Sequence, residues 1–284
     1  MTTNISPLAD VDSRAQIADD VEIGPFCLVG PDVTIGDGTR LDSHVSIMGH
    51  TSIGAGNRFF ANSVIGAEPQ DVAYVGSDTR VEIGDDNIFR EGVTVNRGAD
   101  KEDGVTRIGN KNMLMSNAHV AHNCHVCNNV ILVNGVLLGG HVHVHDGAII
   151  SGNSAIHHFT TVGTMAFVGG CSRCTNDVAP YMLRSGNEDQ QTRMVNIVGM
   201  QRAGISKATI AVIRRAHRLL FREYKKPDSV RTILAEELDG VIPLELSTLL
   251  TFMEASAQGK SGRAREVFRD QGNTDKQETK RRAA

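Results

Sequence analysis

Residues 21–49, VEIGPFCLVGPDVTIGDGTRLDSHVSIMG, decide the fold, because an apolar side chain returns in this stretch at every sixth position. The same period continues on both sides of it. The first run is Ile5, Val11, Ile17, Ile23, Val29, Ile35, Leu41, Ile47, Ile53, Phe59 and Ile65. The second run is Ile108, Leu114, Val120, Val126, Leu132, Leu138, Val144, Ile150, Ile156, Val162 and Val168, and the shorter Ile83, Phe89 and Val95 lie between them. Such regularity indicates a repeating structural unit of six residues.

A period of six fits neither an α-helix, which repeats every 3.6 residues, nor an alternating strand, which repeats every 2. It is typical of a parallel β-helix of triangular cross-section, in which each hexad supplies one short strand and one corner. The small residues and glycines that flank the apolar positions suit the core and the corners of such a fold. Three hexads form a coil of 18 residues with a rise of about 4.8 Å, so residues 18 apart become neighbours on adjacent coils.

Composition excludes several other classes of protein. The chain has 284 residues, of which 40% are hydrophobic and 22% charged, the balance of an ordinary folded protein. Its apolar runs are too short for a transmembrane helix, and the opening MTTNISPLAD lacks the features of a signal peptide. We therefore expect a cytoplasmic protein without integral membrane association. The net charge of −4 argues against nonspecific binding of nucleic acid.

The hexad pattern also predicts the domain organisation. Residues 66–82 and 98–107 break the repeat, and we expect them to leave the coils as loops on the binding face. Helical patterns begin after the cap Ser206, at Pro227 and at Pro243, and the last ends near Gly259. The predicted domains are a β-helix at 1–185, an α-helical C-terminal domain at 186–270 and a disordered tail at 271–284.

Eight of the 11 histidines lie between His119 and His158. The spacing of 18 residues places His122, Gly140 and His158 in one column, and His141 and His157 lie beside it. The arrangement favours a catalytic histidine site next to an exposed backbone amide, with His122, His141 and His157 converging from consecutive coils. The alternative is that the imidazoles are outward-facing surface residues stacked along the coils, and this is our interpretation of the set His125, His143 and His145.

We expect no metal and no cofactor. A zinc site of the kind found in gamma-type carbonic anhydrases uses two histidines five residues apart, and the cluster has no such pair. The pairs Cys124–Cys127 and Cys171–Cys174 have the spacing of zinc ligands, but the offset of 47 residues places them on different sides of the prism. We interpret these cysteines as buried small hydrophobic residues.

Several motifs resemble those of the UDP-N-acetylglucosamine 3-O-acyltransferases, over residues from about 5 to 260. The strings that carry the likeness are IGPFCLVGPDVTIGDGT (23–39), PQDVAYVG (69–76), VEIGDDNIFREGVTVNRG (81–98), NMLMSNAHVAHNCHV (112–126), LLGGHV (137–142), AIHHF (155–159), FVGGCS (167–172) and VAPYMLRSGN (178–187). The resemblance implies a left-handed β-helix and a homotrimer with active sites between subunits. It implies a 3-hydroxyacyl chain on acyl carrier protein as donor and a UDP-amino-sugar as acceptor.

The resemblance also implies roles for single residues. His122 would be the general base, and the Gly140 amide would hold the oxyanion. The residues implied to bind substrate are Asp71 (acceptor sugar), His119, His141 and His157 (donor and acceptor), Gly170 (length of the acyl chain), and Asn196 and Arg202 (donor or nucleotide). Carrier protein is acidic, so the basic residues Lys207, Arg214, Arg215, Arg218, Arg222, Lys225 and Lys226 are either its docking surface or an ordinary solvated helix face.

The chain departs from the family pattern at five contacts of interest. Asn123 replaces the Asp that usually follows the catalytic histidine, and the others are Ala73, Asn96, Val198 and Ala203, with a sixth departure at Glu188, which lies outside the described residues. These changes leave two alternatives beside the O-acyltransferase. One is a related enzyme that acylates the nitrogen of a 3-amino sugar, because an amine needs less help from a base. The other is a trimeric binding protein without catalytic activity.

Overall fold

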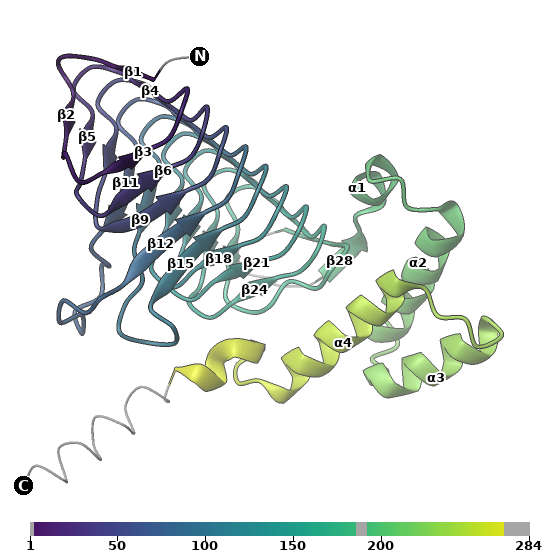
Figure 1. Cartoon of the computed structure of the whole chain (residues 1–284). Helices are drawn as coiled ribbons and strands as arrows, with labels where there is room; N and C mark the ends of the chain where they lie inside the picture. Colours follow the sequence, from purple (N-terminus) through teal and green to yellow (C-terminus); the bar gives the residue numbers. More distant parts are fainter. Residues whose placement is uncertain (1–2, 186–191, 270–284) are drawn as a thin grey trace, which may run out of the picture.

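The computed structural model describes residues 3–185 and 192–269, and it confirms the parallel β-helix followed by α-helices. Figure 1 shows a three-sided column of coils, with helices α1 to α3 gathered at its C-terminal end and α4 running back toward the coils. Three sheets form the faces of the column, and every strand pairing within them is parallel except the final one, between β27 and β28.

The strands are short, as a hexad repeat requires. The first sheet contains β1 (Asn4–Ile5), β4 (Glu22–Ile23), β7 (Arg40–Leu41), β10 (Arg58–Phe59), β13 (Ile88–Phe89), β16 (Met113–Leu114), β19 (Ile131–Leu132), β22 (Ile149–Ile150), β25 (Phe167–Val168), β27 (Met182–Arg184) and β28 (Thr192–Val195). The second contains β2 (Asp10–Val11), β5 (Leu28–Val29), β8 (Ser46–Ile47), β11 (Val64–Ala67), β14 (Thr94–Asn96), β17 (His119–Val120), β20 (Leu137–Leu138), β23 (Ala155–Ile156) and β26 (Arg173–Cys174). The third contains β3 (Gln16–Ile17), β6 (Val33–Ile35), β9 (His50–Ile53), β12 (Arg80–Ile83), β15 (Val105–Ile108), β18 (His125–Val126), β21 (His143–Val144) and β24 (Thr161–Val162).

The hexad residues form the core, as their period predicts. Ile5 pairs with Ile23, and Leu132 with Ile150, each 18 residues apart. Ile35, Ile47 and most other inner positions are fully buried, whereas Ile5, in the edge strand of its sheet, is 42% exposed. Each fully buried aliphatic side chain contributes about 1.5–3 kcal/mol, so the stacked column stabilises the domain without large aromatic rings.

The two interruptions are smaller than the sequence predicts. β12 pairs with β9 and β15 along four residues each, so Arg80–Glu82 and Val105–Arg107 belong to strands. The prediction of loops at 66–82 and 98–107 was therefore wrong at these ends, because backbone pairing continues where the apolar period of the side chains lapses. The loops themselves span 68–79 and 97–104.

A ladder of buried asparagines carries the register across these insertions. Asn57 Oδ1 accepts hydrogen bonds from the backbone and side chain of Asn87, both at 3.0 Å. Asn87 Oδ1 in turn accepts from the Asn112 backbone at 2.9 Å. The spacing between these residues is 30 and then 25 instead of 18, yet the coils stay aligned because each amide side chain binds the backbone of the next.

The corners of the coils have a consistent backbone pattern. The backbone N–H two positions after each inward-facing residue does not take part in the hydrogen bonds between coils. Four of the 7 prolines, which lack an N–H, occupy this position: Pro7, Pro25, Pro31 and Pro180. Gly140 has the same place in its hexad. The following residue often has positive φ, as in Phe26, His44, Asn123, His141 and Phe159.

The C-terminal helices are α1 (Ile197–Arg202), α2 (Lys207–Phe221), α3 (Pro227–Glu237), α4 (Leu244–Gln258) and the 3₁₀ helix η1 (Ala264–Phe268). The three predicted helices are α2, α3 and α4, and Ser206 caps α2 by accepting from the Thr209 N–H. The short α1 and η1 were not predicted. Within the described ranges, no helix is both long enough and apolar enough to cross a membrane.

The cysteines follow the expected pattern only in part. Cys124 and Cys174 are fully buried at inward positions, and burial raises the pKa of the Cys124 thiol to about 12. Cys127 is half-buried and Cys171 is exposed, so the prediction that all four are buried was wrong for these two. Their positions at the corners of the coils place them outside the core.

Candidate functional site

A groove of about 500 Å³ runs across the outer face of the second sheet. Its floor is a row of outward-facing residues that pair along the sheet, namely Thr94, His119, Leu137 and Ala155. Leu137 is 50% exposed, so the groove has an apolar floor open to solvent in the single chain. His122, Gly139 and His158 line its edge, where the chain turns toward the third sheet, and Gln70 reaches it from the loop at 68–79.

His122 and Gly140 lie in contact, as the spacing of 18 residues predicts. A Cβ built on Gly140 would stand 2.7 Å from His122 Nε2, so the imidazole lies directly against the glycine backbone. The backbone also links the two coils here, since the His141 N–H donates to the His122 carbonyl at 3.0 Å. Gly140 is buried behind Gly139, so the prediction that its amide is exposed was wrong, and among residues 3–185 and 192–269 no acceptor is found for its N–H.

Asn123 orients His122, and both polar atoms of its side chain form hydrogen bonds. Its Oδ1 lies 2.9 Å from His122 Nδ1 and accepts from the Ala99 N–H at 2.9 Å. Its Nδ2 donates to the Lys101 carbonyl at 2.8 Å, which a carboxylate oxygen could not do. With Nδ1 donating to Asn123, the His122 lone pair lies on Nε2, the atom nearest Gly140 after Cε1. The hydrogen bonds to the loop at 97–104 therefore favour asparagine over aspartate at position 123.

The groove keeps its histidines neutral. Burial lowers the pKa of His122, and the neighbouring His141 lowers it further, against the opposing effects of Asn123 and Asp71. Burial and the proximity of His122 lower the pKa of His119, whose Nδ1 lies 2.7 Å from the Thr94 hydroxyl. Burial also lowers the pKa of His158. A neutral imidazole at pH 7 can accept a proton, which is what a general base needs.

The loop at 68–79 reaches the groove from the side. Asp71 lies close enough to His122 to affect its pKa, and its carboxylate closes a turn by accepting from the Ala73 N–H at 2.9 Å. Asn96 holds the start of the loop by donating to the Glu68 carbonyl at 2.8 Å. Arg97 adds a hydrogen bond to the Gly66 carbonyl at 3.1 Å. Asn96, one of the departures from the family pattern, thus has a structural role here.

The remaining histidines divide into those near the groove and those away from it. His141 is buried between His122 and Phe159, with ring centroids 5.2 Å and 4.3 Å away. His157 turns its Nδ1 to the His158 carbonyl at 3.0 Å, and His158 is the one that lines the groove. Sequence reasoning placed His158 in the column of His122 but did not select it, although the spacing alone marks it.

Three further predicted binding residues lie away from the groove of the single chain. Asn196 caps α1 through the Gly199 N–H and donates to the Met165 carbonyl at 2.9 Å, so its side chain is already engaged. Arg202 ends α1 and is exposed. Gly170 lies at the opposite edge of the second sheet, where an added Cβ would meet the Gly152 carbonyl at an ordinary 3.5 Å. Val198 and Ala203, the departures near Arg202, are also exposed.

The third sheet carries the second set of histidines. His125 and His143 stack with centroids 4.3 Å apart, and His143 and His145 line a cavity of about 550 Å³ beneath α4 and η1. Burial lowers the pKa of His143 to about 2. This is the stack along the coils that the sequence predicts, although α4 and η1 cover part of it. In the described part of the chain, no group of three or more His, Cys, Asp or Glu residues is arranged to hold a metal ion.

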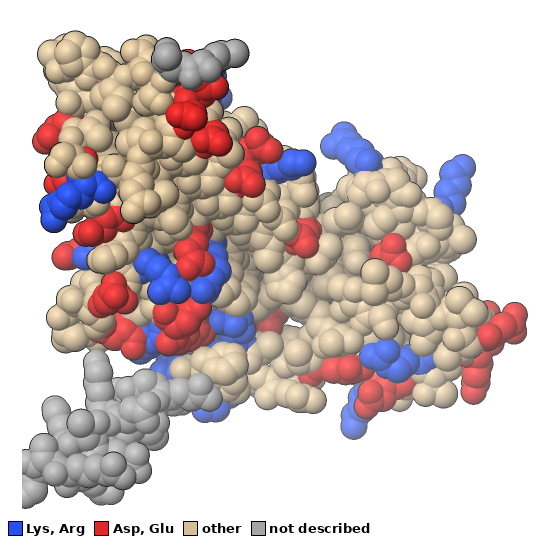
Figure 2. All heavy atoms as spheres, viewed as in Figure 1, with Lys and Arg blue, Asp and Glu red and all other residues tan. Residues whose placement is uncertain are grey.

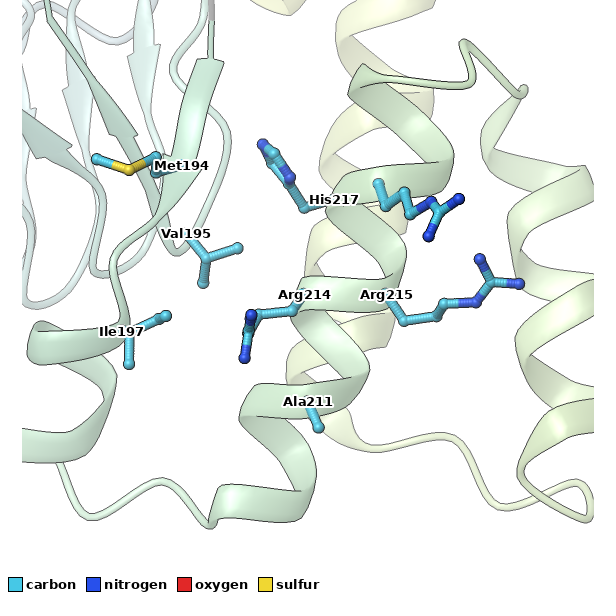
Figure 3. A pocket seen from close by; sticks show the side chains of 8 residues that line it. Met194, Val195, Ile197, Ala211, Arg214, Arg215 and His217 are labelled. Carbon is cyan, nitrogen blue, oxygen red and sulfur yellow. The ribbon is translucent and has the colours of Figure 1, made fainter.

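A further hollow, of about 490 Å³, lies between β28 and α2. Figure 3 shows Met194, Val195 and Ile197 facing Arg214 and His217 of α2 across it. Two of the basic residues on α2 are paired, Arg215 with Glu237 at 2.9 Å and Arg218 with Glu223 at 3.1 Å. The hollow therefore combines an apolar wall with cationic side chains.

The coils and the histidine-lined groove define a hexapeptide-repeat transferase, and a model of the bacterial transferase hexapeptide (six repeats) matches residues 106–140. A second model, described as UDP N-acetylglucosamine O-acyltransferase, domain 2, matches residues 177–261. A relative from Rhizobium rhizogenes named acyl-[acyl-carrier-protein]–UDP-N-acetylglucosamine O-acyltransferase is 45% identical over 246 residues, covering 86% of this chain and 90% of the relative. The chain therefore belongs to the UDP-N-acetylglucosamine O-acyltransferase family.

Solved structures agree with this assignment. The chain is similar to LpxA from Bacteroides fragilis, a UDP-N-acetylglucosamine acyltransferase, with 35% identity and a TM-score of 0.84 over 91% of this chain and 99% of that chain. It is similar to LpxA from Acinetobacter baumannii, with 40% identity and a TM-score of 0.83 over 88% of this chain and 96% of that one. The similarity extends across both the coils and most of the helical part.

Proposed function

We propose that this chain transfers a 3-hydroxyacyl group from acyl carrier protein to the 3-hydroxyl of UDP-N-acetylglucosamine, with His122 as general base. The observation that carries the proposal is the contact between the His122 imidazole, which Asn123 orients and burial keeps neutral, and the backbone of Gly140, whose N–H has no acceptor among the described residues. A base and an oxyanion donor on adjacent coils flank one point in space, and an acyl transfer needs both at one carbonyl carbon.

The reaction then proceeds in two steps. His122 Nε2 takes the proton of the sugar 3-hydroxyl while its oxygen attacks the thioester carbonyl, and the Gly140 N–H donates to the developing oxyanion. The tetrahedral intermediate collapses by breaking the carbon–sulfur bond. The leaving sulfur receives the proton from the His122 imidazolium, so the products are the O-acylated sugar and the free thiol of the carrier. Asn123 keeps Nδ1 protonated throughout.

The two substrates approach from different sides of His122. The apolar floor of Leu137 and Ala155 suits an acyl chain, which would run across the second sheet toward Gly170 at its far edge. The loop with Gln70 and Asp71 borders the other side and suits the polar sugar. His119 lies between them, with Thr94 fixing its ring.

We further propose that the active enzyme is a homotrimer whose neighbouring subunit covers the groove, because Leu137 is half-exposed in the single chain. Asn196 and Arg202 would contribute to donor or nucleotide binding only in that assembly, since neither lines the groove of its own chain. Light scattering and crosslinking test the assembly. A monomer with full activity would contradict it.

The test of the proposal is transfer from 3-hydroxyacyl carrier protein to UDP-N-acetylglucosamine by the parent and by His122→Ala. We expect product from the parent and a loss of at least about 100-fold in kcat for the variant, the range typical of a general base. Full activity of His122→Ala would exclude this mechanism. The 3-amino analogue of the sugar serves as a competing acceptor. A clear preference for it would favour the N-acylating alternative, and failure to bind either sugar by calorimetry would favour a binding protein of another kind.

A further inference from the structure

A second column of residues lies one position beyond His122 and Gly140. It consists of Asn123, His141 and Phe159, all buried and all with positive φ, of 57°, 63° and 61°. The His141 ring stacks on Phe159 with an interplanar angle of 6° and meets the His122 ring edge-on at 89°. Any rotation of His141 therefore changes the surface against which the base His122 packs.

The loop at 97–104 covers this column. Asn123 binds the loop at both ends of its side chain, through the Ala99 N–H and the Lys101 carbonyl. The next residue, Glu102, has a φ of 53° and turns its carboxylate toward His141. Glu102 Oε2 lies 3.2 Å from His141 Nδ1, without the alignment of an ideal hydrogen bond, and the Glu102 side chain is only 20% exposed.

A segment from the C-terminus holds the other oxygen of the same carboxylate. Arg265 of η1 pairs with Glu102 Oε1. The segment is attached to the coils independently of that pair, because the Ala264 N–H donates to Asp177 Oδ2 at 2.8 Å and Arg263 donates to the Thr175 carbonyl. The matched family model ends at residue 261, so Arg265 lies beyond it.

The contacts keep Glu102 ionised in a partly buried place. Burial alone would raise the pKa of this carboxyl group, but His141 and Arg265 together lower the pKa below its ordinary value. Figure 2 shows the mixture of acidic and basic side chains over this side of the coils. A carboxylate beside one ring nitrogen selects the proton position on that imidazole. For histidines that bind metal ions, loss of such a partner typically costs about 10- to 100-fold in affinity or activity.

We propose that Glu102, anchored by Arg265, is a positioning residue that keeps the proton of His141 on Nδ1 and fixes the ring that packs against His122. The effect on turnover rests on the function proposed for His122. The claim about His141 itself is independent of it.

The experiment compares Glu102→Gln, Arg265→Gln and the double variant in the full-length protein. For Glu102→Gln we expect kcat to fall on the order of tenfold while KM for the sugar nucleotide changes little, because Glu102 acts through His141. Arg265→Gln should cause a smaller fall, and the double variant should be no slower than Glu102→Gln, because Arg265 acts through Glu102. Nitrogen NMR of labelled histidine should show His141 with its proton on Nδ1 in the parent and an altered pattern in Glu102→Gln.

Glu254→Gln is the matched control, since Glu254 forms a similar pair with Arg231 at 2.7 Å in the helical domain. It should retain the parental kcat, and circular dichroism melts should show all variants folded. A parental kcat in Glu102→Gln, additive losses in the double variant or unchanged His141 signals would each overturn the proposal. Full activity of His122→Ala would instead contradict the proposed function, and the NMR result would still decide the role of Glu102.

Discussion

The imidazole of His122 packs against the Cα of Gly140, so closely that a methyl group at position 140 would stand 2.6 Å from Cε1. Under the proposed mechanism, residue 140 therefore has to be a glycine as well as an N–H donor, because a side chain there would displace the imidazole of His122. Position 140 combines two requirements, a free amide at the corner of a coil and the absence of Cβ. The sequence suggests the first, and only the packing shows the second.

We predict that Gly140→Ala lowers kcat by about 100-fold or more, because moving a reacting group by about 1 Å can cost that factor. The Gly140 N–H is retained in this variant, so the loss measures the displacement of His122. Steady-state transfer assays and a crystal structure of the variant check both parts. Gly30→Ala is the control, since an added Cβ there meets only ordinary contacts at 3.5 Å or more. Parental activity in Gly140→Ala would show that the two residues are not tightly packed.

We predict that kcat/KM stays constant to a pH below 6.5, the ordinary pKa of histidine, because burial lowers the pKa of His122. Protonation of the proposed base His122 would end activity on the acid side, and it occurs at lower pH when the pKa is lower. In Asn123→Asp, a carboxylate beside Nδ1 favours the imidazolium ion, so the acid limb should move to higher pH. Initial rates between pH 5 and 8.5 measure the shift.

The same variant should be less stable, because the Lys101 carbonyl would face a carboxylate oxygen in place of the Asn123 N–H donor. Asn129→Asp, at an exposed corner with a φ of 55° close to the 57° of Asn123, controls for the added charge. If the acid limb stays in place in Asn123→Asp, residue 123 does not contact the base in the working enzyme.

We predict that His143 makes the protein sensitive to acid. Its pKa is about 2 in the folded state and near 6.5 in the unfolded chain, so the unfolded chain binds one more proton between these values. The free energy of unfolding should therefore fall as pH drops below about 6.5, by about 1.4 kcal/mol per pH unit from this residue alone. His143→Phe keeps a ring that can stack on His125 but cannot titrate.

Urea unfolding of the parent and of His143→Phe at pH 7 and pH 5 tests this. The parent should lose more stability between the two pH values, by about 2 kcal/mol. His44→Phe makes the same change at an exposed histidine that stacks on Phe26, and it serves as the control. An equal loss in the parent and in His143→Phe would contradict the prediction.

We predict that reversing the charge of one basic residue on α2 weakens the binding of acyl carrier protein. Arg214 is exposed and lines the hollow beside β28, so Arg214→Glu should raise KM for the acidic carrier severalfold at low salt, and less at high salt. The KM for the sugar nucleotide should not change. Lys111→Glu, at an exposed corner of the coils, makes the same change in net charge. Equal effects of the two variants would show that α2 is an ordinary solvated helix.

The candidate site divides into a predictable part and an unpredictable one. The contact of His122 with Gly140 follows from the 18-residue spacing, because a repeat with fixed geometry turns sequence distance into spatial distance. The same rule would have found His158. It could not find Glu102 or Arg265, since one lies in a loop that interrupts the repeat and the other in a segment with no repeat at all. The ends of both loops were misjudged for a related reason, because the ladder tolerates side chains that break the apolar pattern.

The sequence by itself therefore determined the coils, their register and the column of groups on one corner, because each apolar residue of a hexad has only one place to be buried. Only the tertiary structure decided which groups from other segments contact that column. Asn123 is suited to its place because its side-chain amide donates to the Lys101 carbonyl. The carboxylate of Glu102, which lies against His141, pairs with Arg265, 163 residues further along the chain. Such contacts depend on where irregular segments come to rest, and no period in the sequence encodes that.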